Sequence, residues 1–309
     1  RRPHFSDYLL MSTNTDLNQQ DRQKLNEFIS DLNYPAIARS TVIRNLNFIN
    51  ENDLKSLLVT LNDSSAVVRY NALMEFRSMN EQDRIVIAKK HMTDPVRLVR
   101  IGSAQLLIGF EGGDWTEAEK LSLFKAKEEL EEMLFGNADF STGRLQLGDY
   151  FMQTGDVVTA IKHYEISLKK DSLLFPVYTN LATAYSITNQ TDKAFETLNF
   201  WMDKEPNANR PYYLRALLNF EIGNNELAKQ DLKMAIELNP EDSRSMYNLA
   251  TFYYQTKDFS KAESMINSAL KLEVNNQDIK YLKALILKEL GRTQEANKIM
   301  QELQSQQAG

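Results

Sequence analysis

Residues 180–198 read NLATAYSITNQTDKAFETL, and residues 248–266 read NLATFYYQTKDFSKAESMI, the same design placed two periods of 34 residues further along. One alanine of this design recurs with the same period in five successive segments, at Ala160, Ala194, Ala228, Ala262 and Ala296. Chance placement of a common residue rarely gives such a series without an insertion. A fixed period of this length indicates one supersecondary unit repeated in tandem.

The 34-residue register defines units that begin at Ser141, Phe175, Asn209, Ser243 and Gln277. The eighth position of every unit is small, which lets two helices approach closely: Gly148, Ala182, Ala216, Ala250 and Ala284. The eleventh position is large except in the third unit, where Asn219 stands. The fifteenth position mostly holds residues that tolerate the left-handed conformation that ends a helix: Gly155, Asn189, Gly223, Lys257 and Gly291. Each unit is therefore predicted to form a tight pair of helices.

These columns, seen again in LGDYFMQTGDVVTAIKHY at residues 147–164, resemble tetratricopeptide repeats. The small, aromatic, glycine, alanine and proline positions of the family are in register from residue 141 to about residue 304. The resemblance implies an all-α fold in which five helix pairs form part of a right-handed α-solenoid, with the first helix of each pair on the concave side. We assign residues 141–309 to these five units and a C-terminal tail.

Upstream, the period shortens to about 30 or 31 residues in YPAIARSTVIRNL (34–46), SAVVRYNALMEF (65–76) and DPVRLVRIGSAQLL (94–107). These strings place Arg39, Arg69 and Arg100 in equivalent slots, and Asp63 and Asp94 in the turns before two of them. The pattern resembles HEAT repeats. We therefore expect three HEAT-like helix pairs over residues 18–110.

Two segments lie outside the repeats. Residues 1–17 begin with RRPHFSDYLL, which has no initiator methionine, signal segment or helix-start pattern, so we interpret them as an N-terminal leader at a truncation edge. Residues 111–140 begin with the turn EGGDW, and Asp114 or Thr116 is expected to cap a helix that bridges the two repeat arrays.

Composition excludes several functions. A net charge of -6 argues against a nucleic-acid partner, and no apolar run approaches the ~18 residues that membrane insertion needs. The absence of cysteine excludes thiolate metal sites and covalent haem attachment within this segment, and the three histidines have no ligand spacing. We therefore expect no catalytic residue, no metal and no cofactor in this segment, and no enzymatic activity.

The concave face of the 34-residue array is the predicted binding surface. Its fifth and twelfth positions carry an aromatic ladder in units three to five, formed by Tyr213, Phe220, Tyr247, Tyr254 and Tyr281. Rigid aromatic side chains supply a large contact area at low entropic cost, so the ladder suits a peptide or a partner helix. The alternative is that several of these rings pack between repeats and are already covered. Leu145 and Asp149 stand where a chaperone-tail clamp needs Lys and Asn, which argues against that ligand.

The predicted function is a non-catalytic protein–protein interaction scaffold, with two alternatives. The string RRPHF, the string PAIARSTVI and the repeat order resemble the C-terminal segment of envelope multihaem cytochrome c-like proteins. That resemblance implies a docking segment of a larger electron-transfer protein, with the haem domain upstream and a periplasmic or cell-envelope location; without it, a cytoplasmic location is expected. The other alternative is the regulatory repeat array of a glycosyltransferase-type protein.

Overall fold

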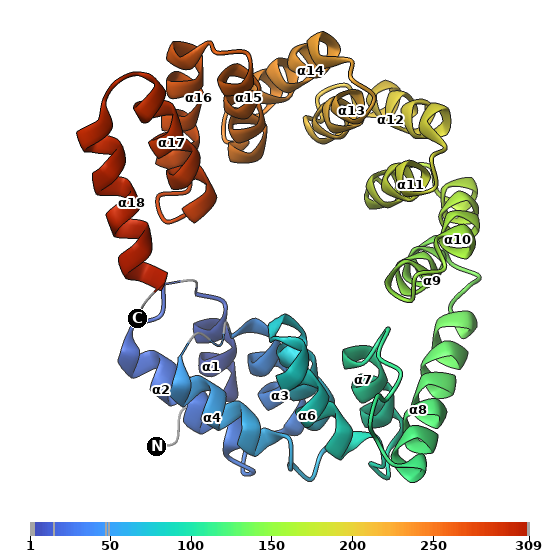
Figure 1. Ribbon diagram of the computed structural model, residues 1–309. Helices are drawn as coiled ribbons and strands as arrows, with labels where there is room; N and C mark the ends of the chain where they lie inside the picture. The colour runs from blue at the N-terminus through green and yellow to red at the C-terminus, as the bar shows by residue number, and fades with distance from the viewer. Residues whose placement is uncertain (1–3, 15, 47, 49, 308–309) are drawn as a thin grey trace. The chain divides into compact units, whose positions relative to one another are not determined.

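The computed structural model describes residues 4–14, 16–46, 48 and 50–307. Within these ranges the chain forms eighteen α-helices, one short 3₁₀-helix and no strand (Figure 1). The prediction of an all-α fold is therefore confirmed. The chain divides into two compact units, Arg1–Asp156 and Val157–Gly309, and the boundary between them falls inside the first of the predicted 34-residue repeats.

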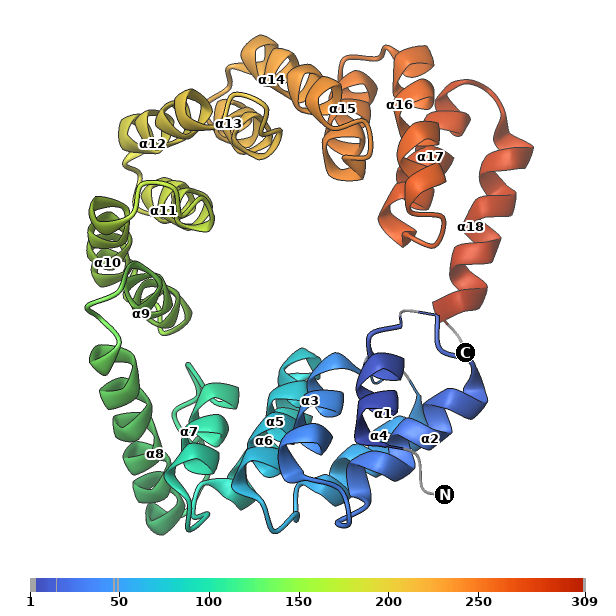
Figure 2. The ribbon, with the colours of Figure 1, turned by 180° about the vertical axis from the view of Figure 1, so that it is seen from behind.

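The first unit is built from helices that pack in consecutive pairs. Its helices are α1 (Phe5–Ser12), α2 (Gln19–Ser30), α3 (Ala36–Asn45), α4 (Glu51–Thr60), α5 (Ala66–Glu75), α6 (Glu81–His91), α7 (Arg97–Leu106), α8 (Glu117–Gly136) and α9 (Ser141–Gln153), with the 3₁₀-helix η1 (Phe76–Ser78) after α5. Helix α2 packs on α3, α4 on α5, and α6 on α7. The second helices of these pairs also pack on one another, and α8 packs on the last of them (Figure 2). Three pairs thus lie within residues 18–110, and their assignment as HEAT repeats stays a prediction.

The first helix of each of these pairs begins in the same way. The side-chain oxygens of Asn18, Asn50 and Asn80 accept hydrogen bonds from the backbone N–H groups of the aspartates three residues later. An asparagine at this position satisfies one of the N–H groups that a helix start leaves without an intrahelical partner. This repeated cap fixes where α2, α4 and α6 begin.

Successive pairs are joined by a row of arginine–carboxylate ion pairs. The ion pairs are Arg39 with Asp63, Arg69 with Asp94, and Arg100 with Glu129. In the second of them, the Nε and Nη2 atoms of the arginine each lie 2.8 Å from a carboxylate oxygen. The aspartate of each turn also accepts a hydrogen bond from the N–H group two residues later, at Ser65 and at Val96. The same carboxylates therefore shape their own turns and bind the preceding pair.

Although no helix-start pattern was found in RRPHFSDYLL, residues 5–12 form α1. His4 caps this helix: its ring nitrogen accepts from the N–H of Ser6, and its backbone N–H donates to Asp7. Tyr8 stacks on Phe28 with ring centroids 4.3 Å apart, and α1 packs on α2 and α3. The start was missed because histidine is an unusual cap residue, whereas Ser, Thr, Asp and Asn are the common ones.

The predicted bridging helix is α8, and Thr116 is its cap. The Thr116 hydroxyl accepts from the N–H of Glu119, whose carboxylate accepts in return from the Thr116 N–H at 2.9 Å. Its buried face carries Leu123, Ala126, Leu130 and Leu134. Helix α9 then packs on α8, where the hydroxyl of Tyr150 donates to Glu131 at 2.7 Å.

The second unit consists of helices that follow the 34-residue register. They are α10 (Val157–Lys170), α11 (Pro176–Ile187), α12 (Thr191–Lys204), α13 (Arg210–Glu221), α14 (Asn225–Leu238), α15 (Ser243–Gln255), α16 (Phe259–Leu272), α17 (Gln277–Glu289) and α18 (Thr293–Gln307). Helices α11 to α18 form four consecutive pairs, and each pair also packs on the next. The repeated alanines Ala194, Ala228 and Ala262 are at most 1% exposed, so they mark the closest helix contacts. The fifteenth position has a positive φ in all five repeats, as predicted, including at Asn189 and Lys257.

Candidate protein-binding surface

The first helices of the repeats in the second unit, α11, α13, α15 and α17, present the side chains that the sequence pattern selected. The exposed and half-buried side chains of these four helices are called the first-helix surface below. Tyr213 and Phe220 lie on α13, Tyr247 and Tyr254 on α15, and Tyr281 on α17. Because these residues are 34 apart in register, equivalent rings occupy equivalent places on successive helices.

Burial divides the five aromatic residues into two groups. Tyr213, Phe220, Tyr247 and Tyr254 are half-buried and pack against the apolar core of the second unit. The Tyr281 side chain is 49% exposed. The four half-buried rings therefore contribute to the core and keep part of their surface open to solvent. They are packed between repeats in part, and none of them is completely covered.

Polar and aromatic neighbours orient these rings. The Arg210 guanidinium lies over the Tyr213 ring, 5.3 Å from its centroid, and the Asn248 side-chain nitrogen lies 3.5 Å from the Tyr213 hydroxyl. A cation over an aromatic face is electrostatically favourable. Tyr254 contacts Phe259 with ring centroids 5.8 Å apart. The rings are thus held by their surroundings before any partner arrives.

A small cavity lies beside the ladder and was not predicted. Its volume is about 140 Å³, and it opens between α11 and α13, with α12 contributing to its wall. Its lining residues are Ala182, Thr183, Ser186, Ala194, Leu198, Leu214, Leu217, Leu218 and Glu221. At one end, the Ser186 hydroxyl donates to the Glu221 carboxylate at 2.8 Å. One sequence feature could have indicated this cavity. The third repeat has leucine at its sixth and ninth positions, where the repeats on either side have Asn and Thr.

Two arginines occupy the second position of neighbouring repeats on the same surface. Arg210, at the start of α13, is half-buried, and Arg244, near the start of α15, is exposed. In the described part of the chain, no carboxylate lies within ion-pair distance of either guanidinium. The nearby carboxylate of Asp242 instead accepts from Asn209 and Ser245, and that of Glu273 accepts from Asn276 and Ser243. Hydrogen bonds from Ser243 and Asn276, together with the charge of Arg244, lower the pKa of Glu273, so Arg244 acts on this carboxylate without forming an ion pair with it.

Asn219 stands at the eleventh repeat position, where the other repeats have a large apolar or aromatic residue, because it belongs to a polar network in the third repeat. Arg215 replaces the leucine found at the seventh position of the neighbouring repeats, and its guanidinium holds both carboxylate oxygens of Asp231, at 2.6 and 2.9 Å. Asn199 accepts from the same guanidinium, and the Asn219 amide donates to Asp231. The ion pair raises the pKa of Arg215. An aromatic ring at position 219 would displace this network.

The second helices line three further cavities that repeat with the same period. They lie between α10 and α12, between α12 and α14, and between α14 and α16, with volumes of about 480, 360 and 290 Å³. Equivalent positions in the three are occupied by Glu165, Asn199 and Lys233. The middle cavity is the one that the Arg215 network lines. The side chains at these equivalent positions differ in charge, so the three cavities do not repeat one binding chemistry.

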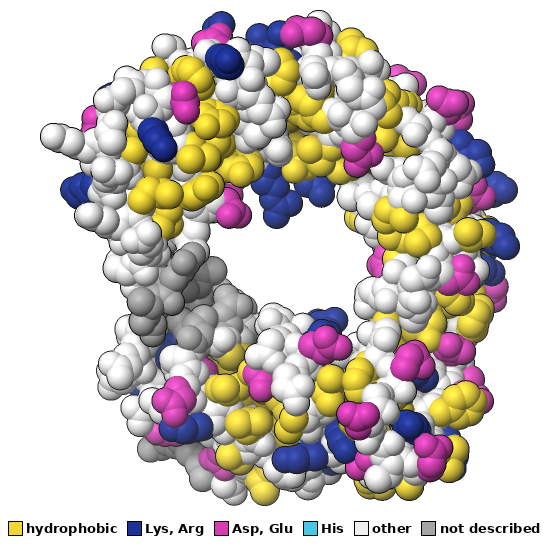
Figure 3. Space-filling view, in the orientation of Figure 1, with side chains coloured by type: hydrophobic (Ala, Val, Ile, Leu, Met, Phe, Trp, Pro, Cys, Tyr) yellow, Lys and Arg dark blue, Asp and Glu magenta, His cyan; other side chains and the backbone are white. Residues whose placement is uncertain are grey.

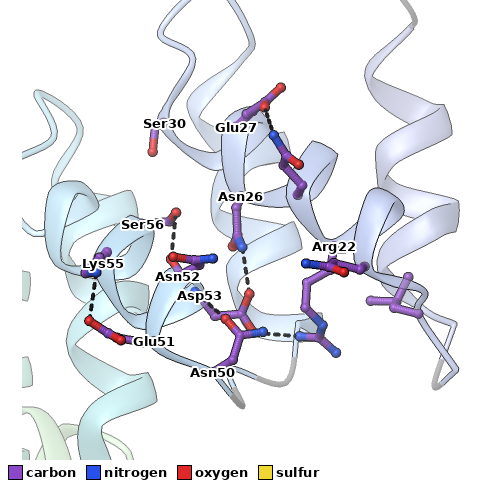
Figure 4. Close-up of a pocket in the computed structure, with 13 residues that line it drawn as sticks. Arg22, Asn26, Glu27, Ser30, Asn50, Glu51, Asn52, Asp53, Lys55 and Ser56 are labelled. Atoms are coloured by element: carbon purple, nitrogen blue, oxygen red, sulfur yellow. Dashed lines mark hydrogen bonds and ion pairs between the residues drawn. The ribbon is translucent and has the colours of Figure 1, made fainter.

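A cavity of about 930 Å³ belongs to the first unit (Figure 4). It lies between α2 and α4, where Arg22 donates to Asp53 at 2.8 Å and Asn26 donates to the same carboxylate at 2.6 Å. The Asp53 side chain is fully buried. These bonds hold two neighbouring helices together, so the polar residues of this cavity serve the packing of the helices.

The described residues offer neither a metal-binding cluster nor a membrane-spanning helix. Over the described ranges there is no cluster of three or more His, Cys, Asp or Glu side chains arranged to hold a metal ion. None of the helices in the same ranges is both long enough and apolar enough to cross a membrane. The space-filling view shows apolar side chains gathered over α15, α16 and α17, with charged groups among them (Figure 3).

Comparison with known sequences identifies the repeats. The sequence model of the tetratricopeptide repeat family matches residues 220–286. The chain is 34% identical over 77 residues to the uncharacterized protein ycf37 of Pyropia yezoensis, covering 25% of this chain and 43% of that protein. It is 23% identical over 155 residues to tetratricopeptide repeat protein 6 of Homo sapiens, covering 50% of this chain and 29% of that protein. The chain thus spans less than half the length of these relatives, and the prediction of tetratricopeptide repeats is confirmed for residues 220–286.

Solved structures with a related arrangement of helices include MamA and YrrB. The MamA structure has a TM-score of 0.45 and 23% identity, covering 54% of this chain and 91% of MamA. The YrrB structure, described as a tetratricopeptide repeat protein with an unusual peptide-binding site, has a TM-score of 0.42 and 13% identity, covering 56% of this chain and 89% of YrrB.

Proposed function

We propose that this chain is a non-catalytic scaffold that binds a peptide or a partner helix on the first-helix surface of its second unit. The observation that carries the proposal is the ladder of five aromatic residues on α13, α15 and α17, all partly open to solvent and held in a 34-residue register. Aromatic anchors of this kind carry much of the binding energy in protein interfaces, because they bury a large area and have few rotamers to lose. The tetratricopeptide match to residues 220–286, which includes four of the five residues, supports this function.

The test truncates the ladder in the full chain. A variant with Tyr213, Tyr247 and Tyr254 all changed to Ala should lose partner recovery in pull-down experiments by at least about tenfold, the equivalent of about 1.4 kcal/mol. Because these rings also pack on the core, circular dichroism must show that the variant is folded. Unchanged recovery by a folded triple variant would refute the proposal.

Two further variants separate binding from folding. Tyr281→Ala removes a ring that is 49% exposed, so it should weaken binding with little loss of stability. Phe200→Ala on α12 removes a ring that is 46% exposed and lies outside the first-helix surface, so it serves as the matched control. Equal effects of the two changes on partner recovery would argue against a binding site on the first helices.

The two alternative functions rest on sequence resemblance. The full coding sequence distinguishes them: CxxCH haem-binding motifs upstream of this segment would favour a docking segment of a multihaem electron-transfer protein, and a transferase domain would favour a regulatory array. The scaffold proposal is compatible with either outcome, because it concerns only the surface of α11, α13, α15 and α17.

A further inference from the structure

We infer that the partner is an extended acidic peptide, which anchors one aliphatic side chain in the cavity between α11 and α13 and pairs its carboxylates with Arg210 and Arg244. This inference rests on the proposed function and adds the chemistry of the partner. It commits to a peptide with a stated pattern of charge and apolarity on the first-helix surface.

The size of the cavity selects a single side chain. Sites for small molecules and cofactors measure roughly 300–1,000 Å³, whereas this cavity measures about 140 Å³. Its wall is largely aliphatic, with Leu198, Leu214 and Leu217 beside small residues. The Ser186 hydroxyl and the Glu221 carboxylate at its end already bond each other, so the recess favours a branched aliphatic group over a charged one. Leu, Ile, Val or Met of a peptide therefore fits the cavity.

The charged residues of the first-helix surface determine which way an acidic peptide would run across it. Glu221 closes the end of the cavity near the C-terminus of α13, and Arg210 lies at the N-terminus of the same helix. Arg244 lies near the N-terminus of α15, at the equivalent repeat position. A peptide that runs from the cavity toward the starts of α13 and α15 therefore leaves an acidic neighbour and reaches two guanidinium groups that form no ion pair with another described residue. Charge-assisted, bidentate hydrogen bonds from arginine are the strongest polar contacts such a peptide can make.

Helix geometry sets the spacing in the peptide. Arg210 and Leu217 are seven residues apart on α13, which corresponds to about 10 Å along the helix axis. An extended chain covers this distance in about three residues, at roughly 3.3 Å per residue. The expected pattern is one aliphatic residue and one or two Asp or Glu residues about three positions away. Tyr213 lies between Arg210 and Leu217 along α13.

The experiment is a selection from a library of random peptides of about twelve residues, long enough to span roughly 40 Å when extended. The immobilised full chain is the target, and the enriched peptides are sequenced. Their affinities are then measured by fluorescence anisotropy for the wild type and for variants. We expect enrichment of an aliphatic residue followed or preceded at the stated distance by acidic residues.

Point variants test each contact separately. Thr183→Phe places a ring into the mouth of the cavity and should weaken the selected peptides about tenfold or more, whereas Thr197→Phe adds the same ring on α12, outside the first-helix surface, and should not. Arg210→Glu with Arg244→Glu should weaken acidic peptides by a similar factor. Lys271→Glu, which reverses one exposed charge on α16, should leave their affinity within about twofold.

The outcomes distinguish this inference from the proposed function. Peptides that lose binding to the Tyr213, Tyr247 and Tyr254 alanine variant but lack the acidic and aliphatic pattern would overturn the inference and leave the scaffold proposal standing. Peptides with the pattern that bind Thr183→Phe and the double arginine variant as tightly as the wild type would also overturn the inference. Absence of any peptide whose binding depends on the first-helix surface would count against both.

Discussion

Arg39 and Asp63 form an ion pair whose two side chains are each 3% exposed. Burial by itself raises the pKa of the Asp63 carboxyl, but the hydrogen bonds from Arg39 and the Ser65 N–H outweigh it and leave that pKa below its ordinary value of 3.8. Removing one partner of such a pair leaves a buried charge without compensation. This residue-level contact therefore contributes to how the first helix pair is attached to the second.

Asp63→Asn should lower the free energy of unfolding by about 3–5 kcal/mol, the usual cost of breaking a buried ion pair. Urea unfolding of the full chain, followed by circular dichroism, measures this change. The control is Arg97→Leu, which removes an ion pair to Glu132 whose side chains are 49% and 70% exposed and should cost less than about 1 kcal/mol.

The pH dependence of this change identifies its cause. A carboxyl whose pKa is lower in the folded than in the unfolded state stabilises the protein above pH 3.8, and this contribution is lost as the pH falls through the folded-state pKa. Stability of the wild type should therefore fall below about pH 4, and the Asp63→Asn chain should fall less steeply. Parallel pH profiles for the two chains would contradict this account of Asp63.

The two helices of each pair in the second unit are joined by a turn whose left-handed residue is not always glycine. Lys257 has a φ of 61°, whereas Gly223 and Gly291 have 80° and 78° at the equivalent positions. A side chain with a Cβ atom is strained in this conformation, and glycine is not. The turn after α15 therefore stores strain that the turn after α13 avoids.

Lys257→Gly should raise the free energy of unfolding by about 0.5–1 kcal/mol, because the relief of strain exceeds the entropic cost of glycine in the unfolded chain. The reciprocal change Gly223→Lys should lower it by a similar amount. Thermal unfolding of both variants measures the effect, and a loss of stability in Lys257→Gly would show that this turn is not strained.

Periodicity made most of the helical elements predictable. Alanine and other small residues recur every 34 residues because the helix contacts recur with that spacing. The sequence alone therefore predicts the helix pairs from α11 to α18. The equivalent positions of Arg39, Arg69 and Arg100 could also be predicted from the sequence. The partner of Arg100 could not, because it is Glu129 on α8, whereas the other two arginines pair with an aspartate of the following turn. Helix α1 was missed for a local reason, since its cap is His4.

The candidate site was predictable only in part. The aromatic ladder follows from register, but the degree to which each ring is covered depends on packing between repeats, which no single position reveals. The cavity beside Leu214 and Leu217 lies where α11, α12 and α13 meet, with Ala182 and Ala194 also in its lining. Such a cavity depends on how three helices pack together. The residue types at one repeat position therefore show which side chains could line a cavity, but they do not show that a cavity forms.

In the whole molecule, the two compact units are stabilised differently. Arg1–Asp156 joins its helix pairs through a row of ion pairs between arginines and turn aspartates. Val157–Gly309 combines small buried residues at close helix contacts with polar bonds between pairs, such as the ion pair of Arg292 with Glu263. Its first helices present large rings and two arginines that form no ion pair among the described residues, within a chain of net charge -6. We expect binding to be located on those helices, with the remaining surface serving as support.

Site-specific photo-crosslinking tests that expectation in the full chain. A photoreactive phenylalanine analogue is placed at Tyr281 on the first-helix surface and, in a second chain, at Phe200 on α12, two positions that are 49% and 46% exposed. In the cells that express the protein, we predict a discrete crosslinked partner at position 281 that is absent at position 200 and is competed away by the selected acidic peptides. Crosslinking that is equal at the two positions, or confined to position 200, would contradict the assignment of binding to the first helices.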